Sequence, residues 1–284
     1  MKVTQKNFRG YENFALITGA AGGMGVQYAE ALAMMGYNLI IVDINEQRLL
    51  AAAEDLKAKV AALDDWRAEK KDRFQVLPFV QDLSLMDAAE TIKAKADEAG
   101  AVVELLINNA GMLFVTGVAE TSEKRLKLMM MVHCVTPLLL CREFVPGMKE
   151  RGNGYVLNIS SLAAWMEWPL IGMYANTKRF VKGFSRSLRC ECRGTGVSVT
   201  NAYFGAVDTP LIPLAPNLKK LAHNLSVMIY PETAVNKALT ATFKRRKGTM
   251  PGFLNKIFKP ILPLLPESLL GWAARKWGHY FANI

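Results

Sequence analysis

The chain has 284 residues, of which 51% are hydrophobic and 21% charged, and this composition indicates a globular protein with a large buried core. The four cysteines show no CxxC spacing and the three histidines are scattered, which excludes a disulfide framework and argues against a metal site. Residues 1–14 have no apolar core and no run of about 18 uncharged apolar residues follows, so we expect a cytoplasmic protein without a signal peptide or membrane span.

The first predicted elements are a strand, a glycine turn, a helix and a second strand. Residues 14–18 are an apolar run, residues 18–25 read TGAAGGMG, and a helical pattern continues to Gly36. Residues 38–42 form the second strand, and Asp43 follows it. This order is typical of a dinucleotide-binding unit, in which glycines let the backbone approach the pyrophosphate and the helix N-terminus faces the phosphates.

Asp43 is the predicted determinant of cofactor choice. A carboxylate at the end of the second strand accepts hydrogen bonds from the ribose hydroxyls and repels a 2′-phosphate. Ile44 follows it and the nearest arginine is Arg48, so no basic clamp for that phosphate is evident. The sequence therefore favours NAD over NADP.

The rest of the chain continues the alternation of strands and helices. Strands are expected at residues 74–80, 102–107, 154–159 and 197–202, and helices at residues 46–71, 85–99, 120–149 (distorted near Pro137) and 174–194. Six β/α units predict an α/β fold with a doubly wound, Rossmann-type parallel sheet in one domain, residues 1–250, followed by a helical C-terminal extension, residues 251–284. Ligands of such sheets lie at the carboxyl ends of the strands.

Polar residues follow two of the predicted strands. Asp82, after the third strand, is expected to cap the next helix, to contact the adenine, or to do both. Asn108 and Asn109, after the fourth strand, are expected to tie loops together by hydrogen bonds and so to shape the floor of the cofactor site.

Ser161, Tyr174 and Lys178 form the candidate catalytic group. Tyr174 and Lys178 are four residues apart and share one helix face. A phenol with a pKa of about 10 needs help to exchange a proton near neutral pH, and an adjacent ammonium lowers that pKa. Ser161 would hold a substrate oxygen beside the phenol. Such a pair alone is more often part of an ordinary helix, but the other motifs at strand ends favour an active site.

Together these motifs resemble the short-chain dehydrogenase/reductase family, in the manner of a hydroxysteroid-dehydrogenase-like member, over residues 12–210. The resemblance rests on TGAAGGMG (18–25), Asp82, NNAG (108–111), Ser161, YANTK (174–178) and FGAVDT (204–209). It implies hydride transfer between a nicotinamide and a carbonyl or secondary alcohol. Tyr174 would be the general acid/base, Lys178 would lower its pKa and bind the nicotinamide ribose, and Ser161 would polarise the substrate oxygen.

The resemblance also implies a set of cofactor-binding residues. These are Gly19, Ala21, Gly23, Met24, Gly25, Asp43, Asp82, Leu83, Asn109, Ala110, Gly111, Tyr174, Lys178, Val207 and Thr209. Two positions depart from the family pattern. His133 stands where the family has an asparagine that holds a relay water, and Phe204 where it has a proline. His133 is therefore a further candidate catalytic residue, which could replace a hydrogen bond of the relay or titrate near neutral pH, and a purely structural bond is the equal alternative.

The tail is basic and apolar. Residues 244–284 contain eight lysines and arginines against Glu267, and residues 268–281 are expected to form an amphipathic helix. This charge is consistent with a solvated basic face or with peripheral contact with an anionic membrane. The apolar residues between the charges argue against nucleic acid as the partner. The family resemblance implies a homodimer or homotetramer through the helices at 120–149 and 174–194.

The predicted pocket walls favour a large hydrophobic small-molecule substrate. They are Trp165, Met166, Trp168, Tyr203, Phe204, Leu211, Ile212, Leu214 and Met228. A hydroxysteroid fits this lining best. A 3-oxoacyl thioester is the alternative, and its reductase should show a basic patch for the carrier phosphate beside the pocket mouth. A non-catalytic NAD-sensing protein is the third interpretation, against which the intact Ser161, Tyr174 and Lys178 argue.

Overall fold

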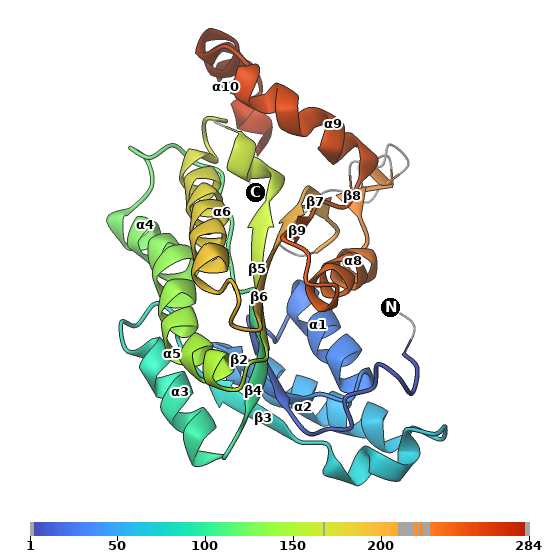
Figure 1. Ribbon diagram of the computed structural model, residues 1–284. Coiled ribbons are helices and arrows are strands. Elements are labelled where there is room, and N and C mark those ends of the chain that lie inside the picture. The colour runs from blue at the N-terminus through green and yellow to red at the C-terminus, as the bar shows by residue number, and fades with distance from the viewer. Residues whose placement is uncertain (1–2, 167, 210–218, 221, 224–227, 282–284) are drawn as a thin grey trace.

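A parallel seven-stranded sheet runs through the molecule in the order β3-β2-β1-β4-β5-β6-β9 (Figure 1). The computed structural model describes residues 3–166, 168–209, 219–220, 222–223 and 228–281. The strands are β1 Phe14–Thr18, β2 Asn38–Asp43, β3 Val76–Val80, β4 Val103–Asn108, β5 Gly154–Ser161, β6 Val197–Phe204 and β9 Gly248–Thr249. The strand order reverses between β1 and β4, which places a ligand crevice at their carboxyl ends. The predicted doubly wound, Rossmann-type fold is confirmed.

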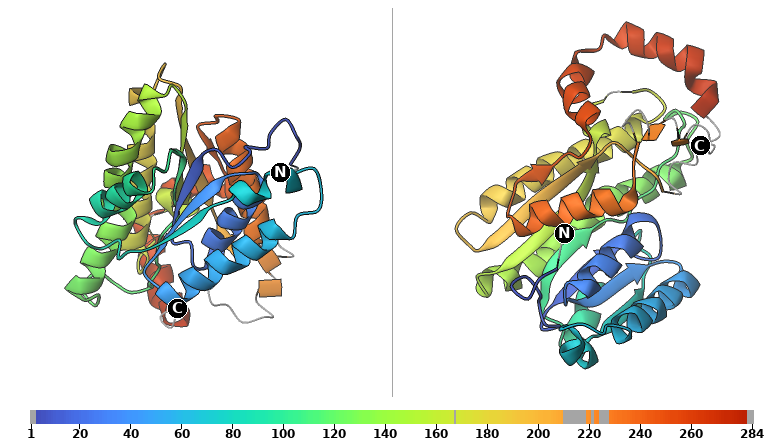
Figure 2. Two further views of the ribbon diagram at one scale, coloured as in Figure 1. Left: turned by 90° about the horizontal axis from the view of Figure 1, so that it is seen from below. Right: turned by 90° about the vertical axis from the view of Figure 1, so that its right-hand side faces the viewer.

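Helices cover both faces of the sheet (Figures 1 and 2). One face carries α1 Gly23–Met34, α2 Glu46–Ala61 and α8 Pro231–Phe243, and the other carries α3 Ala88–Glu98, α4 Glu123–Met130, α5 Thr136–Glu150 and α6 Gly172–Glu191. Strand β1 serves both layers, because Ala15 and Ile17 belong to one buried cluster while Phe14 and Leu16 belong to the other. Burial on both faces explains why this strand reads as a continuous apolar run.

The helix predicted over residues 46–71 is shorter in the structure. Helix α2 ends at Ala61, and a separate 3-10 helix, Ala68–Arg73, follows after a turn. In that turn the Asp65 carboxylate accepts hydrogen bonds from the backbone N–H and the guanidinium of Arg67. Local bonds of this kind compete with helical pairing, so helix propensity alone overestimated the length of this helix.

The distortion predicted near Pro137 is confirmed as a π-helical turn, Met131–Val135, between α4 and α5. Proline has no N–H to donate, which frees the preceding turn from regular pairing. Although no membrane span was expected, the continuous helix Glu123–Glu150 is long and apolar enough to cross a membrane, with a mean hydropathy of 1.5 in its most apolar window. Half of that window is buried, and α5 packs against α3, β4 and β5, as a core helix does.

Three short strands were not predicted. Strand β9 pairs with β6 at the sheet edge, and β7 Ala206–Val207 pairs with β8 Met228–Ile229 in a second, two-stranded sheet. Two-residue strands are too short for the apolar alternation that reveals a strand in a sequence. The chain then forms α9 Phe253–Ile261, a 3-10 turn and α10 Glu267–Phe281, which lie beyond the carboxyl ends of the main strands (Figures 1 and 2). Helix α10 agrees with the amphipathic helix predicted for the tail.

Candidate active site

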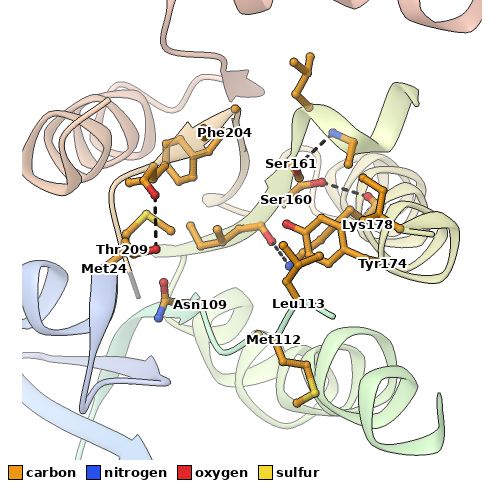
Figure 3. A pocket seen from close by; sticks show the side chains of 18 of the residues that line it. Met24, Asn109, Met112, Leu113, Ser160, Ser161, Tyr174, Lys178, Phe204 and Thr209 are labelled. Atoms are coloured by element: carbon orange, nitrogen blue, oxygen red, sulfur yellow. Dashed lines mark hydrogen bonds between the residues drawn. The ribbon is translucent and has the colours of Figure 1, made fainter. Parts of the chain in front are cut away.

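A pocket of about 280 Å³ opens at the carboxyl ends of the central strands (Figure 3). It brings together two groups of residues that the sequence suggested separately. The predicted cofactor-binding residues that line it, other than Tyr174 and Lys178, are Met24, Asn109, Gly111, Val207 and Thr209, and the predicted catalytic residues that line it are Ser161, Tyr174 and Lys178. The glycine turn and the Tyr174 helix therefore face a single cavity.

The turn between β1 and α1 requires glycine at two positions. Gly19 has a φ of +65°, and a Cβ on it would lie 2.8 Å from Ala110 Cα. A Cβ on Gly25 would lie 2.0 Å from the carbonyl oxygen of Gly19. Helix α1 therefore starts directly against the end of β1, and its N-terminus forms a cradle of the kind that holds a pyrophosphate.

Asn109 and Thr18 join this turn to the end of β4. Asn109 Nδ2 donates to the carbonyl oxygens of Thr18 and Gly19 at 3.0 and 3.2 Å. The backbone N–H groups of Asn109 and Ala110 both donate to Thr18 Oγ1 at 3.1 Å. The expected tie between loops is thus confirmed for Asn109, and Thr18 is an additional member that the sequence did not suggest.

Asp43 lies at the end of β2, beside the glycine turn. Its Oδ2 accepts a hydrogen bond from the Ala21 N–H at 3.0 Å, and its Oδ1 accepts one from the Asn45 N–H at 3.0 Å. These bonds fix the carboxylate against the turn. Each oxygen has a second lone pair, so the group retains capacity for further donors such as ribose hydroxyls.

Asp82 and Leu83 follow β3, but Asp82 does not cap the next helix as expected. Its Oδ1 accepts from the Ser84 N–H at 2.8 Å and so closes a local turn, while α3 begins only at Ala88. That turn separates strand and helix, which the sequence pattern did not show. The Leu83 side chain is buried in the core, and its carbonyl oxygen accepts from Thr136 Oγ1 at 2.6 Å.

Ser161 ends β5, and Tyr174 and Lys178 lie at the start of α6. Lys178 is buried, and its Nζ donates to the Ile159 carbonyl oxygen at 3.1 Å and lies 5.7 Å from the centre of the Tyr174 ring. Burial lowers the pKa of Lys178 to about 8. Burial also raises the pKa of Tyr174, and the hydrogen bond with Ser161 opposes that rise. Desolvation therefore dominates the pKa of the phenol, and the bond with Ser161 is the interaction that lowers it.

His133 is buried in the π-helical turn and connects two parts of the site. The Met112 N–H donates to His133 Nε2 at 2.9 Å, so this nitrogen carries no proton. His133 Nδ1 lies 2.9 Å from Thr177 Oγ1, which in turn donates to the Tyr174 carbonyl oxygen at 2.7 Å. Burial and the nearby Lys178 ammonium hold the pKa of His133 well below its usual value. A structural bond to a neutral imidazole, rather than titration near neutral pH, is what this geometry favours.

Helix α6 is attached to the sheet by a row of buried polar groups, of which the sequence analysis named only Asn108, and Asn108 bonds to a neighbouring strand and not to a loop as expected. Asn108, Asn158 and Asn201 stand side by side on β4, β5 and β6. Asn108 Nδ2 donates to Asn158 Oδ1 at 2.8 Å, and Asn158 and Asn201 both donate to Ser185 Oγ, at 2.9 and 3.1 Å. The only trace of this row in the sequence was one asparagine near the end of each of three successive strands. This row fixes the helix that carries Tyr174 and Lys178.

The described wall of the pocket is mainly apolar, but it differs in part from the predicted one. Met166 and Phe204 line the pocket as expected. Trp165 and Tyr203 face a different hollow, because neighbouring residues of β6 point to opposite sides of the sheet and Trp165 packs on Tyr203. Trp168 and Met228 are also absent from the described lining. Leu211, Ile212 and Leu214 lie outside the described residues.

The fold and this pocket together define a dehydrogenase-type site. The family model described as short chain dehydrogenase matches residues 13–216. The chain therefore belongs to the short-chain dehydrogenase family, whose members are oxidoreductases that act on CH–OH and ketone groups. The family predicted from the sequence motifs is confirmed.

Individual relatives are similar over most of the chain. A very-long-chain 3-oxoacyl-CoA reductase of Phaeosphaeria nodorum is 29% identical over 261 residues, which cover 89% of this chain and 74% of that protein. A 17-beta-hydroxysteroid dehydrogenase type 3 of Danio rerio is 31% identical over 210 residues, which cover 70% of this chain but only 62% of that protein. A solved structure of a 7beta-hydroxysteroid dehydrogenase has a TM-score of 0.75 and 25% identity, with 89% of this chain and 93% of that chain covered.

Proposed function

We propose that this oxidoreductase interconverts a secondary alcohol and a ketone on a large apolar substrate, with a nicotinamide dinucleotide as cofactor. The observation that supports this most directly is that Ser161, Tyr174 and Lys178 face the same pocket as Met24 of the glycine turn and Asn109, which is bonded to that turn. When bound, the dinucleotide would supply or accept the hydride. The glycine cradle, Asn109 and Thr209 would hold it.

Each catalytic residue has a distinct proposed role. The Tyr174 hydroxyl gives a proton to the substrate oxygen or takes one from it, as a general acid/base. Ser161, which shares a hydrogen bond with Tyr174, orients that oxygen. The Lys178 ammonium favours the phenolate form and is placed to bind a ribose hydroxyl. With a pKa of about 8, Lys178 is mostly charged at neutral pH.

We propose NAD as the preferred cofactor. The Asp43 carboxylate is held at the glycine turn by two backbone N–H groups, where a 2′-phosphate would meet like charge. The expected outcome is a higher kcat/KM with NAD⁺ than with NADP⁺. Preference for NADP⁺ would contradict the role given to Asp43 and leave the proposed reaction intact.

Two substrate classes fit the pocket. Lys178 is the only charged side chain among the described lining residues, and Met112, Leu113, Met166 and Phe204 give an apolar wall. A hydroxysteroid would be enclosed by such a wall without needing a charged partner. A 3-oxoacyl thioester fits equally, and the similarity to very-long-chain 3-oxoacyl-CoA reductases favours it.

The test is nicotinamide absorbance during turnover of hydroxysteroids, 3-oxoacyl thioesters and medium-chain alcohols by the purified protein. Tyr174→Phe should lower kcat by about 10²–10⁴-fold, since it removes the proton donor. The variant should still bind NADH, as followed by nicotinamide fluorescence. NADH binding without turnover of any substrate by the wild type would instead indicate a non-catalytic, NAD-sensing protein.

We further propose that the tail contacts an anionic membrane surface peripherally. Its exposed large apolar side chains are Ile257, Phe258, Ile261, Leu264, Leu269 and Trp272. Lys256, Lys259 and Arg275 lie among them and are exposed as well. Apolar residues with interspersed positive charge are the combination that binds the interface of anionic lipid.

A homodimer or homotetramer is proposed as the assembled form. Three large apolar side chains, Met130, Leu138 and Phe180, are 36–41% exposed on α4, α5 and α6, where the family resemblance placed the subunit contacts. The molar mass in solution, from light scattering, checks this proposal. A monomer at micromolar concentration would contradict it.

A further inference from the structure

A second hollow, separate from the catalytic pocket, lies between α6, the β6–β9 edge of the sheet and α9. Its volume is about 470 Å³. Five of its lining residues are basic: Lys182, Arg186, Arg189, Lys247 and Lys259. None of its described lining residues carries a carboxylate. We call this site the basic hollow.

Within the described part of the chain, no carboxylate neutralises the positive charges of the basic hollow. Among the described residues, no ion pair involves any of the five basic side chains. Burial and the neighbouring charges of Arg179 and Lys259 lower the pKa of Lys182. Like charges are thus gathered at a concave surface, which makes it favourable for an anion to enter.

Two features hold three of these cations, Arg189, Lys182 and Lys259, in place. Arg189 donates from Nε to the Val199 carbonyl oxygen at 2.8 Å and from Nη2 to the Lys247 carbonyl oxygen at 2.7 Å. The ammonium groups of Lys182 and Lys259 lie over the Trp165 ring at 4.5 and 4.9 Å from its centre. A set of cations fixed in this way loses less conformational entropy on binding than freely solvated side chains would.

The basic hollow and the catalytic pocket share a wall. Trp165 lines the hollow and the next residue, Met166, lines the pocket. In the same way Tyr203 lines the hollow, and its neighbour on β6, Phe204, lines the pocket. Lys182 also follows the pocket residue Lys178 by one turn of α6. The two cavities therefore adjoin across this wall, and a single molecule would occupy both only by passing around it.

We propose that the basic hollow binds the phosphate groups of a carrier to which the reacting acyl chain is joined as a thioester. The proposal rests on the proposed function and narrows its substrate class, because a steroid has no group for this site. It also supplies the basic patch that a 3-oxoacyl thioester reductase should show beside its pocket. Phosphate is the recognised chemistry, and the carrier and a lipid headgroup are its two sources.

The test compares two thioesters with the same 3-oxoacyl chain, one on coenzyme A and one on N-acetylcysteamine, which has no phosphate. The variant is Arg186→Gln/Lys247→Gln, in which both changed side chains are exposed. Lys237→Gln/Lys244→Gln, at exposed positions outside the hollow, loses the same charge and is the matched control. The hollow variant should raise KM for the coenzyme A thioester at least tenfold. Its kinetics with N-acetylcysteamine thioester should stay within twofold of wild type, and the control should match wild type with both.

Direct binding separates the subsite from the reaction. With NAD⁺ saturating, adenosine 3′,5′-bisphosphate should bind in calorimetry to the wild type and the control, and at least tenfold more weakly to the hollow variant. Equal KM values for both thioesters, together with no bisphosphate binding, would overturn the subsite and leave the reductase function standing. Hollow-dependent binding to phosphoinositide vesicles without bisphosphate binding would assign the site to a lipid headgroup and overturn the carrier proposal. Turnover of steroids but of neither thioester would remove the substrate class on which the proposal rests.

Discussion

His133 shows how one residue departs from the family pattern and still serves the same region of the site. Its imidazole accepts a hydrogen bond from the Met112 N–H and contacts Thr177. It therefore links the loop after β4 to the helix that carries Tyr174. The role requires a neutral ring, because a protonated Nε2 would face an N–H donor. Burial enforces the neutral form.

This arrangement predicts a loss of stability in acid. The pKa of His133 is far below its ordinary value in the folded protein, so below about pH 6.5 only the unfolded chain takes up this proton. The free energy of unfolding should therefore be unaffected by His133 above pH 6.5. Below that pH it should fall by up to about 1.4 kcal/mol per unit, until the folded pKa is reached.

Urea unfolding of wild type and His133→Asn between pH 7.5 and 5 measures this effect. The asparagine retains an acceptor but does not titrate, so the stability of the variant should decline less steeply with falling pH. The contributions of all other titrating groups are the same in both proteins and cancel in the comparison. Parallel curves for the two proteins would show that His133 is not held neutral.

At the scale of elements, the position of Tyr174 depends on how α6 is fixed to the sheet. Ser185 is fully buried and accepts hydrogen bonds from two asparagines of neighbouring strands. It also donates to the Val181 carbonyl oxygen at 2.7 Å. A single hydroxyl therefore serves three polar groups that water does not reach.

Ser185→Ala should lower the free energy of unfolding by about 1–3 kcal/mol, because the two buried amides lose their acceptor. Ser187→Ala is the matched control on the same helix, since Ser187 is exposed, and it should change stability by less than about 0.5 kcal/mol. Denaturant midpoints at equal slope report both values. Equal stability of the two variants would mean that water or a rearranged amide replaces the Ser185 hydroxyl.

Some elements could be predicted from the sequence and others could not, and the difference has physical causes. Strands β1 and β2 were evident because burial on both faces makes their sequences continuously apolar. The proposed catalytic residues were evident because each follows a strand end or a fixed helical spacing. The contact of His133 with Met112 and the register of Asn158 with Asn201 depend on tertiary placement, which no local pattern encodes. The basic hollow was missed likewise, because five separate segments build it.

At the scale of the whole molecule, the tail makes one end of the sheet different from the other. Helices α9 and α10 extend beyond the carboxyl ends of the strands, the end at which the catalytic pocket also opens (Figure 2). A membrane contact through these helices would bring the pocket near the lipid surface. An apolar substrate dissolved in the membrane would then have a short path to the site.

The protein should co-sediment with anionic vesicles, less strongly with neutral ones, and less at high salt. Phe258→Ser/Leu264→Ser removes two exposed apolar side chains of the tail and should weaken binding to anionic vesicles about tenfold for each side chain that enters the lipid, at about 1.5 kcal/mol each. Leu50→Ser/Met86→Ser, at exposed positions away from the tail, should bind like wild type. Vesicle binding that is equal for both variants would locate the contact elsewhere.

The bond between Met112 and His133 also provides a natural spectroscopic probe of the catalytic pocket. The Met112 amide proton can exchange with solvent deuterium only when that bond opens, and opening requires the loop after β4 to separate from the π-helical turn. Its exchange rate therefore measures how often this side of the pocket loosens. A dinucleotide that binds against Asn109 and Gly111 should slow the exchange, even when no substrate is turned over. The occupancy of the site could thus be followed at one backbone amide, without any knowledge of the substrate.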